Sequence, residues 1–488
     1  MKKTLLSLAF LCATFAFSQS DLGKISNQLP ENYQTTKIEA PAFLKNFPTT
    51  NWIDNADTSW YNSTSTSFQI STAAELAGLT KLVFNGNDFS GKTITLMQDV
   101  DLAGHLWAPI GYGYQKPFSG TFEGNHKTVK NVLINRETNG DFVGFFGQFL
   151  KATLKNLTVD GVKIFAKDTV GGMIGNVSTN SYVENCHVKN AEITITGYNG
   201  GGFSGGILTN SEVINCSSSA TVVGVNQIGG FVGSSWDKTK ITNCFSEGSV
   251  KGEYIIGGFN GFSTFAFAPN RDNEMINCYT RSNVEATSFM AGGFFGYTQQ
   301  NAILKNVYSA GTVTNVQDSG AFMGAVGSTT IQNAHFDHTL APYDAIGKFD
   351  YGDPTTYDIT AKTSSEMKSE AFKTTLNAGA ATEVWSIDPS VNDGYPYLNT
   401  ITTLAVNDAV TNIADVKIYP TIVDNQLTIV SSDKVLSYNI IDMSGKSVKQ
   451  MLAKENQNSV DVSQLGKGIF IINIKTEKGT KSLKFIKK

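Results

Sequence analysis

The chain has 488 residues, which is long enough for more than one domain. Only 16% of the residues are charged, the formal net charge is −4, and 46 residues are glycine. Proteins that bind nucleic acid normally carry a basic face, so this charge balance argues against that class of partner. The high glycine content and the low charge favour short strands and tight turns over long helices.

The N-terminus, "MKKTLLSLAFLCATFAFSQS", is typical of a secretory signal peptide. Two lysines precede an apolar run from Leu5 to Phe17, and this run is too short to span a bilayer. Small and polar residues then suit cleavage. We therefore predict a signal peptide over residues 1–19, a leader over residues 20–51, and an exported mature chain without a transmembrane segment.

A short helix is predicted to precede the central part of the chain. Thr72 and Glu75 have the spacing of a capping box, in which each residue satisfies a backbone N–H group of the other. Leu76, Leu79 and Leu82 follow at helical spacing.

A sevenfold repeat occupies the middle of the chain. Each copy contains a glycine motif such as "GGFVG" at 229–233, with an asparagine about ten residues further on in most copies. The last glycines of successive motifs lie 28, 30, 28, 28, 35 and 28 residues apart. Because each copy also holds two short β-rich runs, the pattern predicts an all-β fold, a right-handed parallel β-helix.

Three positions of the repeat are expected to form interior columns, because adjacent coils lie about 4.8 Å apart and like residues then stack. The glycine motif supplies Phe145, Met173, Phe203, Phe231, Phe259, Phe294 and Phe322. The position two before the asparagine supplies Leu154, Val183, Val213, Ile241, Met275, Leu304 and Ile331, and the position after it Leu157, Cys186, Cys216, Cys244, Cys278, Val307 and Ala334. The asparagines Asn156, Asn185, Asn215, Asn243, Asn277, Asn306 and Asn333 are expected to form a ladder at a corner.

Two patterns inside the repeat resemble reactive sites, but both can be explained by the repeat. Ser204 stands in a G-x-S-x-G pattern, which can mark a nucleophilic serine, but other copies place Phe146, Val232 or Asn260 in its slot. The pattern is therefore a by-product of the glycine motif. The four cysteines share one interior column, which favours free buried thiols over disulfides in this exported chain, although both remain open.

The region from 52 to 400 resembles proteins with the GLUG repeat, named for a Gly-Leu-any-Gly core. The resemblance rests on the repeats, on lead-in segments such as "WAPIG" and "PFSGTFEGNHKTVKNVLI", and on the closing "NDGYPYL". It implies a bacterial surface protein and leaves the activity open. Thr363 and Glu366 form a second capping-box pattern, so we expect a helix there and short capping helices at both ends of the solenoid.

The pattern changes after a predicted linker over 401–414. Residues 415–488 carry twelve lysines against seven acidic residues and read as strands joined by turns, which predicts a small β-sandwich. This module resembles the type A C-terminal sorting domain of type IX secretion. The matching residues are Tyr419, Pro420, Asp442, Gly445, Lys446, Leu465, Gly468, Phe470, Lys487 and Lys488. The resemblance implies recognition by the type IX translocon and export to the outside of a Gram-negative cell.

Two features suggest a ligand-binding surface. The fifth coil carries an insertion with Phe265, Phe267, Arg271 and Asp272, and insertions in solenoids often form binding loops. The residues two after three successive asparagines are Phe245, Tyr279 and Tyr308. Strand alternation predicts that they point outward as an exposed aromatic strip, suited to sugars or apolar partners. Alternatively, the stacked rings only stabilise the sheet.

No sequence motif indicates catalysis, a metal site or a cofactor. The histidines do not form H-E-x-x-H, and the acidic residues of the repeats do not form a column. We therefore expect a non-enzymatic secreted or surface protein that acts in adhesion or binds a glycan or another cell-surface partner. A polysaccharide-degrading enzyme on a β-helix scaffold and an accessory protein of the secretion or gliding apparatus remain as alternatives.

Overall fold

The computed structural model describes residues 38–264, 272–314, 316–350, 357–380, 382–399, 416–431, 434–442, 447–452, 459–476 and 479–488. The chain divides into two compact units, Met1–Thr402 and Thr403–Lys488. The predicted signal peptide, most of the leader and the linker therefore lie outside the described residues.

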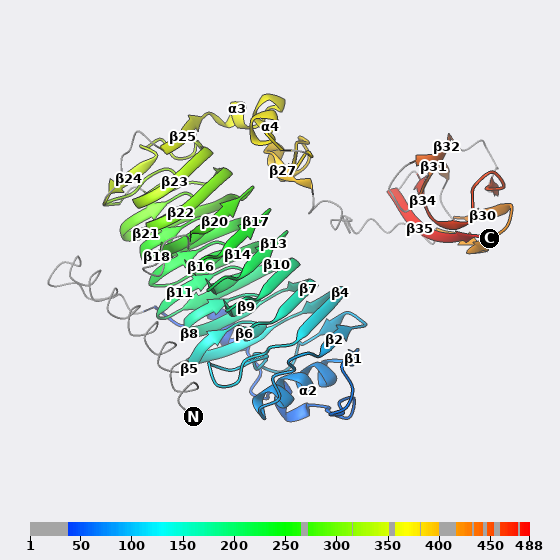
Figure 1. The fold of residues 1–488 in the computed structure, drawn as a ribbon, viewed down its shortest axis with the longest axis horizontal. Helices are drawn as coiled ribbons and strands as arrows, with labels where there is room; N and C mark the ends of the chain where they lie inside the picture. The colour runs from blue at the N-terminus through cyan, green and yellow to red at the C-terminus, as the bar shows by residue number, and fades with distance from the viewer. Residues whose placement is uncertain are drawn as a thin grey trace. The chain divides into compact units, whose positions relative to one another are not determined.

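The first unit is a parallel β-solenoid of about ten turns, as the repeat predicts (Figure 1). Its first strands are β1 (Ser67–Ile70), β2 (Thr93–Leu96), β3 (Val100–Asp101), β4 (Thr121–Lys130), β5 (Leu133–Val143), β6 (Phe146–Leu150), β7 (Thr153–Asp160), β8 (Lys163–Gly171), β9 (Ile174–Ser178) and β10 (Tyr182–Ile195). Then follow β11 (Tyr198–Gly201), β12 (Ser204–Leu208), β13 (Glu212–Ile214), β14 (Ser217–Val223), β15 (Asn226–Gly229), β16 (Val232–Trp236), β17 (Lys240–Thr242) and β18 (Phe245–Gly257). The last are β19 (Asn260–Thr264), β20 (Asn273–Ile276), β21 (Tyr279–Gly292), β22 (Phe295–Ser309), β23 (Met323–Asp337), β24 (Ile346–Phe349) and β25 (Tyr357–Lys362).

Each coil pairs in register with the next coil along the solenoid. For the coil that runs from β12 to β15, Ser204 pairs with Val232, Val213 with Ile241, and Asn226 with Tyr254. Equivalent residues of successive repeats therefore lie directly above one another, which is the geometry that the sequence columns require.

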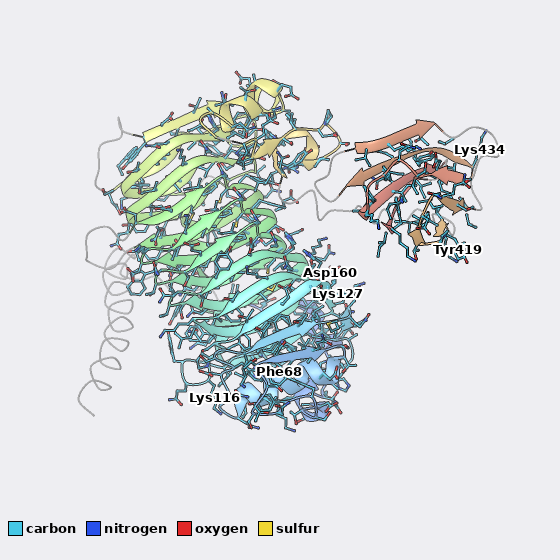
Figure 2. All side chains as sticks on the ribbon, turned by 45° about the vertical axis from the view of Figure 1, so that its right-hand side comes forward. Phe68, Lys116, Lys127, Asp160, Tyr419 and Lys434 are labelled. Atoms are coloured by element: carbon cyan, nitrogen blue, oxygen red, sulfur yellow. The ribbon has the colours of Figure 1, made fainter. Side chains whose placement is uncertain are left out.

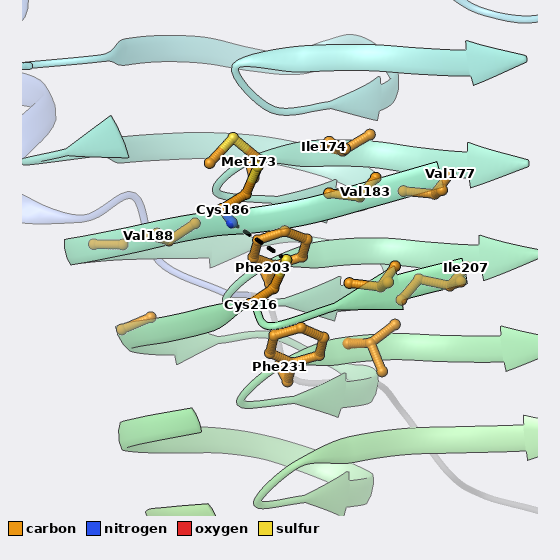
Figure 3. Packing of buried hydrophobic residues seen from close by; sticks show 14 of the residues in the cluster. Met173, Ile174, Val177, Val183, Cys186, Val188, Phe203, Ile207, Cys216 and Phe231 are labelled. Atoms are coloured by element: carbon orange, nitrogen blue, oxygen red, sulfur yellow. Dashed lines mark hydrogen bonds between the residues drawn. The ribbon is translucent and has the colours of Figure 1, made fainter. Parts of the chain in front are cut away.

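The three predicted columns fill the interior. The phenylalanine rings stack with centroids 4.8 Å apart for Phe203 and Phe231 (Figure 3), and 4.9 Å apart for Phe231 and Phe259. The glycine next to each ring permits the close contact between coils. A Cβ atom added to Gly230 would lie 2.1 Å from the carbonyl oxygen of Gly258.

The four cysteines are free and buried, as the interior column favours. The backbone N–H groups of Cys186 and Cys216 each donate to the Sγ atom of the cysteine in the next coil, at 3.4 Å (Figure 3). Burial raises the pKa of each thiol, in Cys278 to about 12. The thiols therefore act as small apolar side chains.

The asparagine ladder is present at a corner of the solenoid. The ladder residues have φ angles between 53° and 56°, a left-handed conformation that asparagine tolerates better than most residues. The Nδ2 atom of Asn277 donates to Oδ1 of Asn243 at 3.1 Å, and Asn306 donates to Asn277 at 3.1 Å. The asparagines thus suit the corner geometry, and Asn243, Asn277 and Asn306 each bond to both neighbouring coils.

Helices flank the repeats where the capping boxes predict them. Thr72 and Glu75 cap α2 (Ala73–Phe84), which buries Leu76 and Leu79 against the interior of the first coils. Thr363 and Glu366 cap α3 (Ser364–Met367), and α4 (Glu370–Leu376) follows. The remaining short elements of this unit are η1 (Ala42–Asn46), η2 (Trp52–Asn55), η4 (Asn392–Gly394), β26 (Trp385–Ser386) and β27 (Tyr397–Leu398).

The second unit consists of two small sheets around one core, as a sandwich requires. The three-stranded sheet contains β28 (Lys417–Tyr419), β30 (Gln426–Val430) and β33 (Ser459–Asp461). The five-stranded sheet contains β29 (Ile422–Val423), β35 (Gly479–Lys487), β34 (Gly468–Thr476), β31 (Val435–Asp442) and β32 (Ser447–Leu452). Leu427 and Ile429 from one sheet and Ile440 and Ile472 from the other share the core. Over the described residues of both units, no helix is long and apolar enough to cross a membrane.

The corner geometry gives a testable prediction for Asn277. We expect Asn277→Ala to lower the free energy of unfolding by roughly 3 kcal/mol. The substitution removes two amide hydrogen bonds, and alanine lacks the polar side chain that helps asparagine to adopt a positive φ angle. Asn277→Gly loses the same bonds but tolerates the backbone, so we expect a loss of roughly 2 kcal/mol. Urea unfolding of both variants measures the difference. Equal losses would contradict the role of the φ angle.

Candidate functional site

The predicted aromatic strip exists as a ladder but is not exposed. The ring centroids of Phe245 and Tyr279 lie 4.8 Å apart, and those of Tyr279 and Tyr308 lie 5.0 Å apart, with nearly parallel planes. However, Tyr279 is only 2% exposed and Tyr308 is fully buried. The prediction of an exposed strip is therefore wrong, although the outward direction of the rings follows from the strand alternation.

The ladder is covered because the chain folds back over it after the last coil. Trp385 packs against Tyr279 and Tyr308, with centroids 5.9 and 5.7 Å away, and Phe372 from α4 meets Tyr308 edge-on at 5.8 Å. The Tyr308 hydroxyl donates to the carbonyl oxygen of Pro396 at 2.5 Å. Burial raises the pKa of both tyrosines well above the usual value.

Charged residues join the coils to the segment that follows the last coil and covers the ladder. Arg281 in β21 donates to Oδ1 of Asn392 at 3.0 Å and lies 3.4 Å from a carboxylate oxygen of Asp393. Lys368 reaches the same Asp393 carboxylate at 3.2 Å. On its other side Arg281 lies 3.8 Å from Glu247, whose pKa is raised by burial. The closing "NDGYPYL" segment therefore anchors the cover to the coils.

The insertion of the fifth coil is described only at its end. Phe265, Phe267 and Arg271 lie outside the described residues, while Asp272 is partly exposed just before β20. The neighbouring Asn273 is buried, and its Nδ2 atom donates to Ser263 Oγ at 3.2 Å while its Oδ1 atom accepts from Thr239 Oγ1 at 2.9 Å. The insertion thus returns to the solenoid through a buried amide, and its ligand-binding role stays a prediction.

A different aromatic cluster is exposed near the N-terminal end of the solenoid. It consists of Phe84, Tyr112, Tyr114, Lys116, Arg136 and Phe142, which we call the aromatic–basic cluster. Phe84 is 45% exposed and Tyr114 is 39% exposed. Lys116 lies on the outer side of the solenoid, near its N-terminal end (Figure 2).

Cations lie over the ring faces of this cluster. The Nζ atom of Lys116 is 3.8 Å from the ring centroid of Phe84, and the Arg136 guanidinium is 5.0 Å from that of Tyr112. Tyr114 meets Phe142 edge-on at 4.6 Å. Burial lowers the pKa of Arg136, but an arginine still keeps its charge at neutral pH. The cluster therefore combines exposed ring surface with two positive charges.

The local sequence explains why this cluster forms. Gly111 and Gly113 have φ angles of 87° and 58°, which allow a tight turn, and the Tyr112 N–H group donates to the Lys116 carbonyl oxygen at 2.8 Å. The turn thereby presents its two tyrosines beside α2 and β5. The signal in the sequence is "GYGYQKP" at 111–117, where aromatic residues occupy a glycine turn instead of a strand.

Ser204 is not placed as a nucleophile. It is fully buried, and its Oγ atom donates to the carbonyl oxygen of Gly206 at 2.9 Å. Among the described residues, no three or more histidine, cysteine, aspartate or glutamate side chains gather as a metal site.

The residues of the predicted sorting signal lie in the second unit. Tyr419 ends β28 and is 74% exposed, and a cis peptide bond joins it to Pro420 (Figure 2). Phe470 is buried and packs on Phe485 at 5.6 Å. Leu465 is partly buried against the same core.

The other residues of the signal differ in how far they are described. Gly468 begins β34, Lys487 ends β35, and Lys488 is exposed. Asp442 is described only as the last residue of β31, while Gly445 and Lys446 lie outside the described residues.

Two buried histidines, each two residues after a ladder asparagine, predict a loss of stability in acid. His187 Nδ1 lies 2.9 Å from Ser217 Oγ, and His335 packs edge-on against Phe372 at 5.0 Å. Burial lowers the pKa of each to about 4 from a usual 6.5. Between these values the unfolded chain binds a proton and the folded chain does not, so stability falls as the pH drops.

We expect each histidine to account for roughly 2 to 3 kcal/mol of lost stability between pH 7 and pH 4. His187→Gln and His335→Gln should each reduce this pH dependence, measured as the shift of the urea midpoint between the two pH values. The matched control is the exposed His338→Gln. A pH dependence that is the same in all three variants and in the wild type would contradict the assignment.

Comparisons with known families agree with both parts of the chain. Residues 417–488 match the secretion system C-terminal sorting domain, and residues 224–251 match the GLUG motif. The matched GLUG segment corresponds to one coil, from β15 into β18. No curated protein matches the chain. The chain is an exported protein, secreted or held at the cell surface, that joins a GLUG-type β-solenoid to a type IX secretion sorting domain.

Proposed function

We propose that the protein is a non-enzymatic binding protein of the cell exterior, and that its aromatic–basic cluster binds glycans that carry acidic groups. The observation that carries the proposal is the exposure of Phe84, whose ring lies under Lys116, and of Tyr114, which shares a turn with the Tyr112 ring under Arg136. Sugar rings present apolar C–H faces that pack on aromatic side chains, and carboxylate or sulfate groups pair with cations. Export by type IX secretion would deliver such a surface to the glycans outside the cell.

The composition of the cluster favours binding over bond cleavage. A glycosidase generally needs two carboxyl groups on either side of the bond that it cleaves. The six residues of the cluster include two cations and no carboxyl group. The cluster can therefore hold an acidic glycan, but it lacks the acid and base of the usual hydrolytic mechanism.

The proposal is tested with the mature chain from residue 20 on an array of neutral and acidic glycans. We expect Phe84→Ala/Tyr114→Ala to weaken binding of an acidic glycan by about tenfold or more, because it removes the exposed ring surface. Lys116→Gln should weaken binding less and should reduce its dependence on salt, because one screened charge pair is lost. Isothermal titration at two salt concentrations measures both effects.

Phe349→Ala is the matched control, because Phe349 is 44% exposed and lies in β24, near the other end of the solenoid. It should bind like the wild type. Unchanged binding in Phe84→Ala/Tyr114→Ala would refute the site. Release of shorter sugar products from a bound polysaccharide would favour the enzyme alternative. Recovery of a secretion-machinery protein without glycan binding would favour the accessory alternative.

A further inference from the structure

A second apolar cluster lies outside the solenoid core on the fifth and sixth coils. Two ring pairs bridge these coils, with centroids 5.3 Å apart for Tyr254 and Phe289 and 5.6 Å apart for Phe262 and Tyr297. The cluster is separate from the interior and is completed by Val225, Ile255, Met290 and Ala325. We call these eight residues the outer cluster.

The outer cluster is confined to a short length of the solenoid. In the register that contains Tyr254 and Phe289, the neighbouring coils place Asn226 and Gln317. In the register of Phe262 and Tyr297, the preceding coil places the partly exposed Ser234. Two large rings therefore stack in each register over two coils, with polar residues in the adjacent coils and Tyr198 one coil beyond Asn226. A run of apolar rings that is limited in this way is expected for a local docking surface.

The corner beside the outer cluster shows the same change. Ile255 and Met290 have φ angles of 60° and 59°, and the equivalent corner residues of the preceding coils are Asn199 and Gln227. A β-branched residue in the left-handed region is strained, so Ile255 costs stability unless its side chain packs well. The apolar side chain at this corner thus points to a function in packing.

The outer cluster is buried although it faces away from the interior. Tyr254, Phe262 and Phe289 are each 8% exposed, and Tyr297 is 6% exposed. The partly buried hydrophobic residue that packs against the cluster is Ile38. Ile38 is also the first residue that the structure describes, so the described chain begins at this surface.

The course of the chain after Ile38 supports a strap along the outside of the solenoid. The Nζ atom of Lys163, the first residue of β8, lies 5.7 Å from the ring centroid of Phe43. Trp52 then donates to the carbonyl oxygen of Leu102 at 2.8 Å. Residues 38–52 therefore contact the outer cluster, then β8, and then the first coils at the N-terminal end.

We propose that leader residues 20–37 dock on the outer cluster and extend this strap. The segment reads "SDLGKISNQLPENYQTTK", in which Leu22, Ile25, Leu29 and Tyr33 recur every three or four residues. Over residues 22–29 such spacing can present one apolar face against the rings, and Tyr33 follows after Pro30, which ends the helical period. The occupant is joined to Ile38 by the chain itself, so its effective concentration at the cluster is high.

The test compares the mature chain from residue 20 with a chain that begins at residue 38. We expect the shorter chain to bind more of an apolar dye and to lose hydrogen-exchange protection in β18, β19, β21 and β22. A synthetic peptide of residues 20–37 should bind the shorter chain and restore the protection. A peptide with Asn at the four apolar positions should bind about tenfold more weakly or not at all.

A cluster variant separates docking from folding. Phe289→Ser/Tyr297→Ser in the shorter chain should abolish peptide binding, while Phe349→Ser, at an exposed ring elsewhere on the solenoid, should not. Circular dichroism verifies that each variant is folded, and Phe289→Ala/Tyr297→Ala replaces the serine variant if it is not.

Three outcomes would overturn the proposal. The peptide could fail to bind the folded shorter chain. Protection could survive removal of the leader but be lost on removal of 265–271, which would make the insertion the occupant. Hydrogen-exchange protection that appears only when the protein dimerises would make a second copy of the chain the occupant. Glycan binding by the aromatic–basic cluster is measured separately and does not decide this test.

Discussion

The solenoid depends on one constraint, the in-register stacking of each coil on the next at the spacing of hydrogen-bonded strands. A residue that occupies a given position therefore meets the residue at the same position in the neighbouring coils. Flat rings satisfy this requirement by stacking, as Phe203, Phe231 and Phe259 do in the interior. Asparagine satisfies it by bonding amide to amide, and glycine satisfies it at the positions where a Cβ atom would meet the next backbone.

This translational order explains why the interior is predictable from the sequence. One interior column consists of Cys186, Cys216, Cys244 and Cys278, which follow one another at intervals of about one coil. Side chains in such a column are buried among other residues of the repeat, so the repeat itself predicts their packing. The outward direction of Tyr279 and Tyr308 follows from the same reasoning. Their burial does not, because it depends on Trp385 and Pro396, which follow the last coil and carry no periodic signal.

The same difference applies to the candidate binding surfaces. The aromatic–basic cluster joins Phe84 from a helix, Tyr112 and Tyr114 from a glycine turn, and Arg136 from a strand. These residues have no common spacing, so only the fold brings them together. Conversely, Phe245, Tyr279 and Tyr308 have a regular spacing and form a ladder that the protein uses for its own packing. Regular spacing thus indicates structure in this chain, and the proposed glycan site uses surface aromatics without a regular spacing.

The buried cysteine column has a consequence for the passage of the protein out of the cell. A thiol attacks a disulfide only as a thiolate, and burial keeps the thiols protonated, with the pKa of Cys278 raised to about 12. Once its coils have stacked, the protein can therefore neither exchange disulfides with other exported proteins nor form mixed disulfides with them. The order of events matters, because before stacking the four thiols of this column are ordinary thiols in an oxidising compartment. Stacking of the coils thus itself protects these thiols from disulfide exchange.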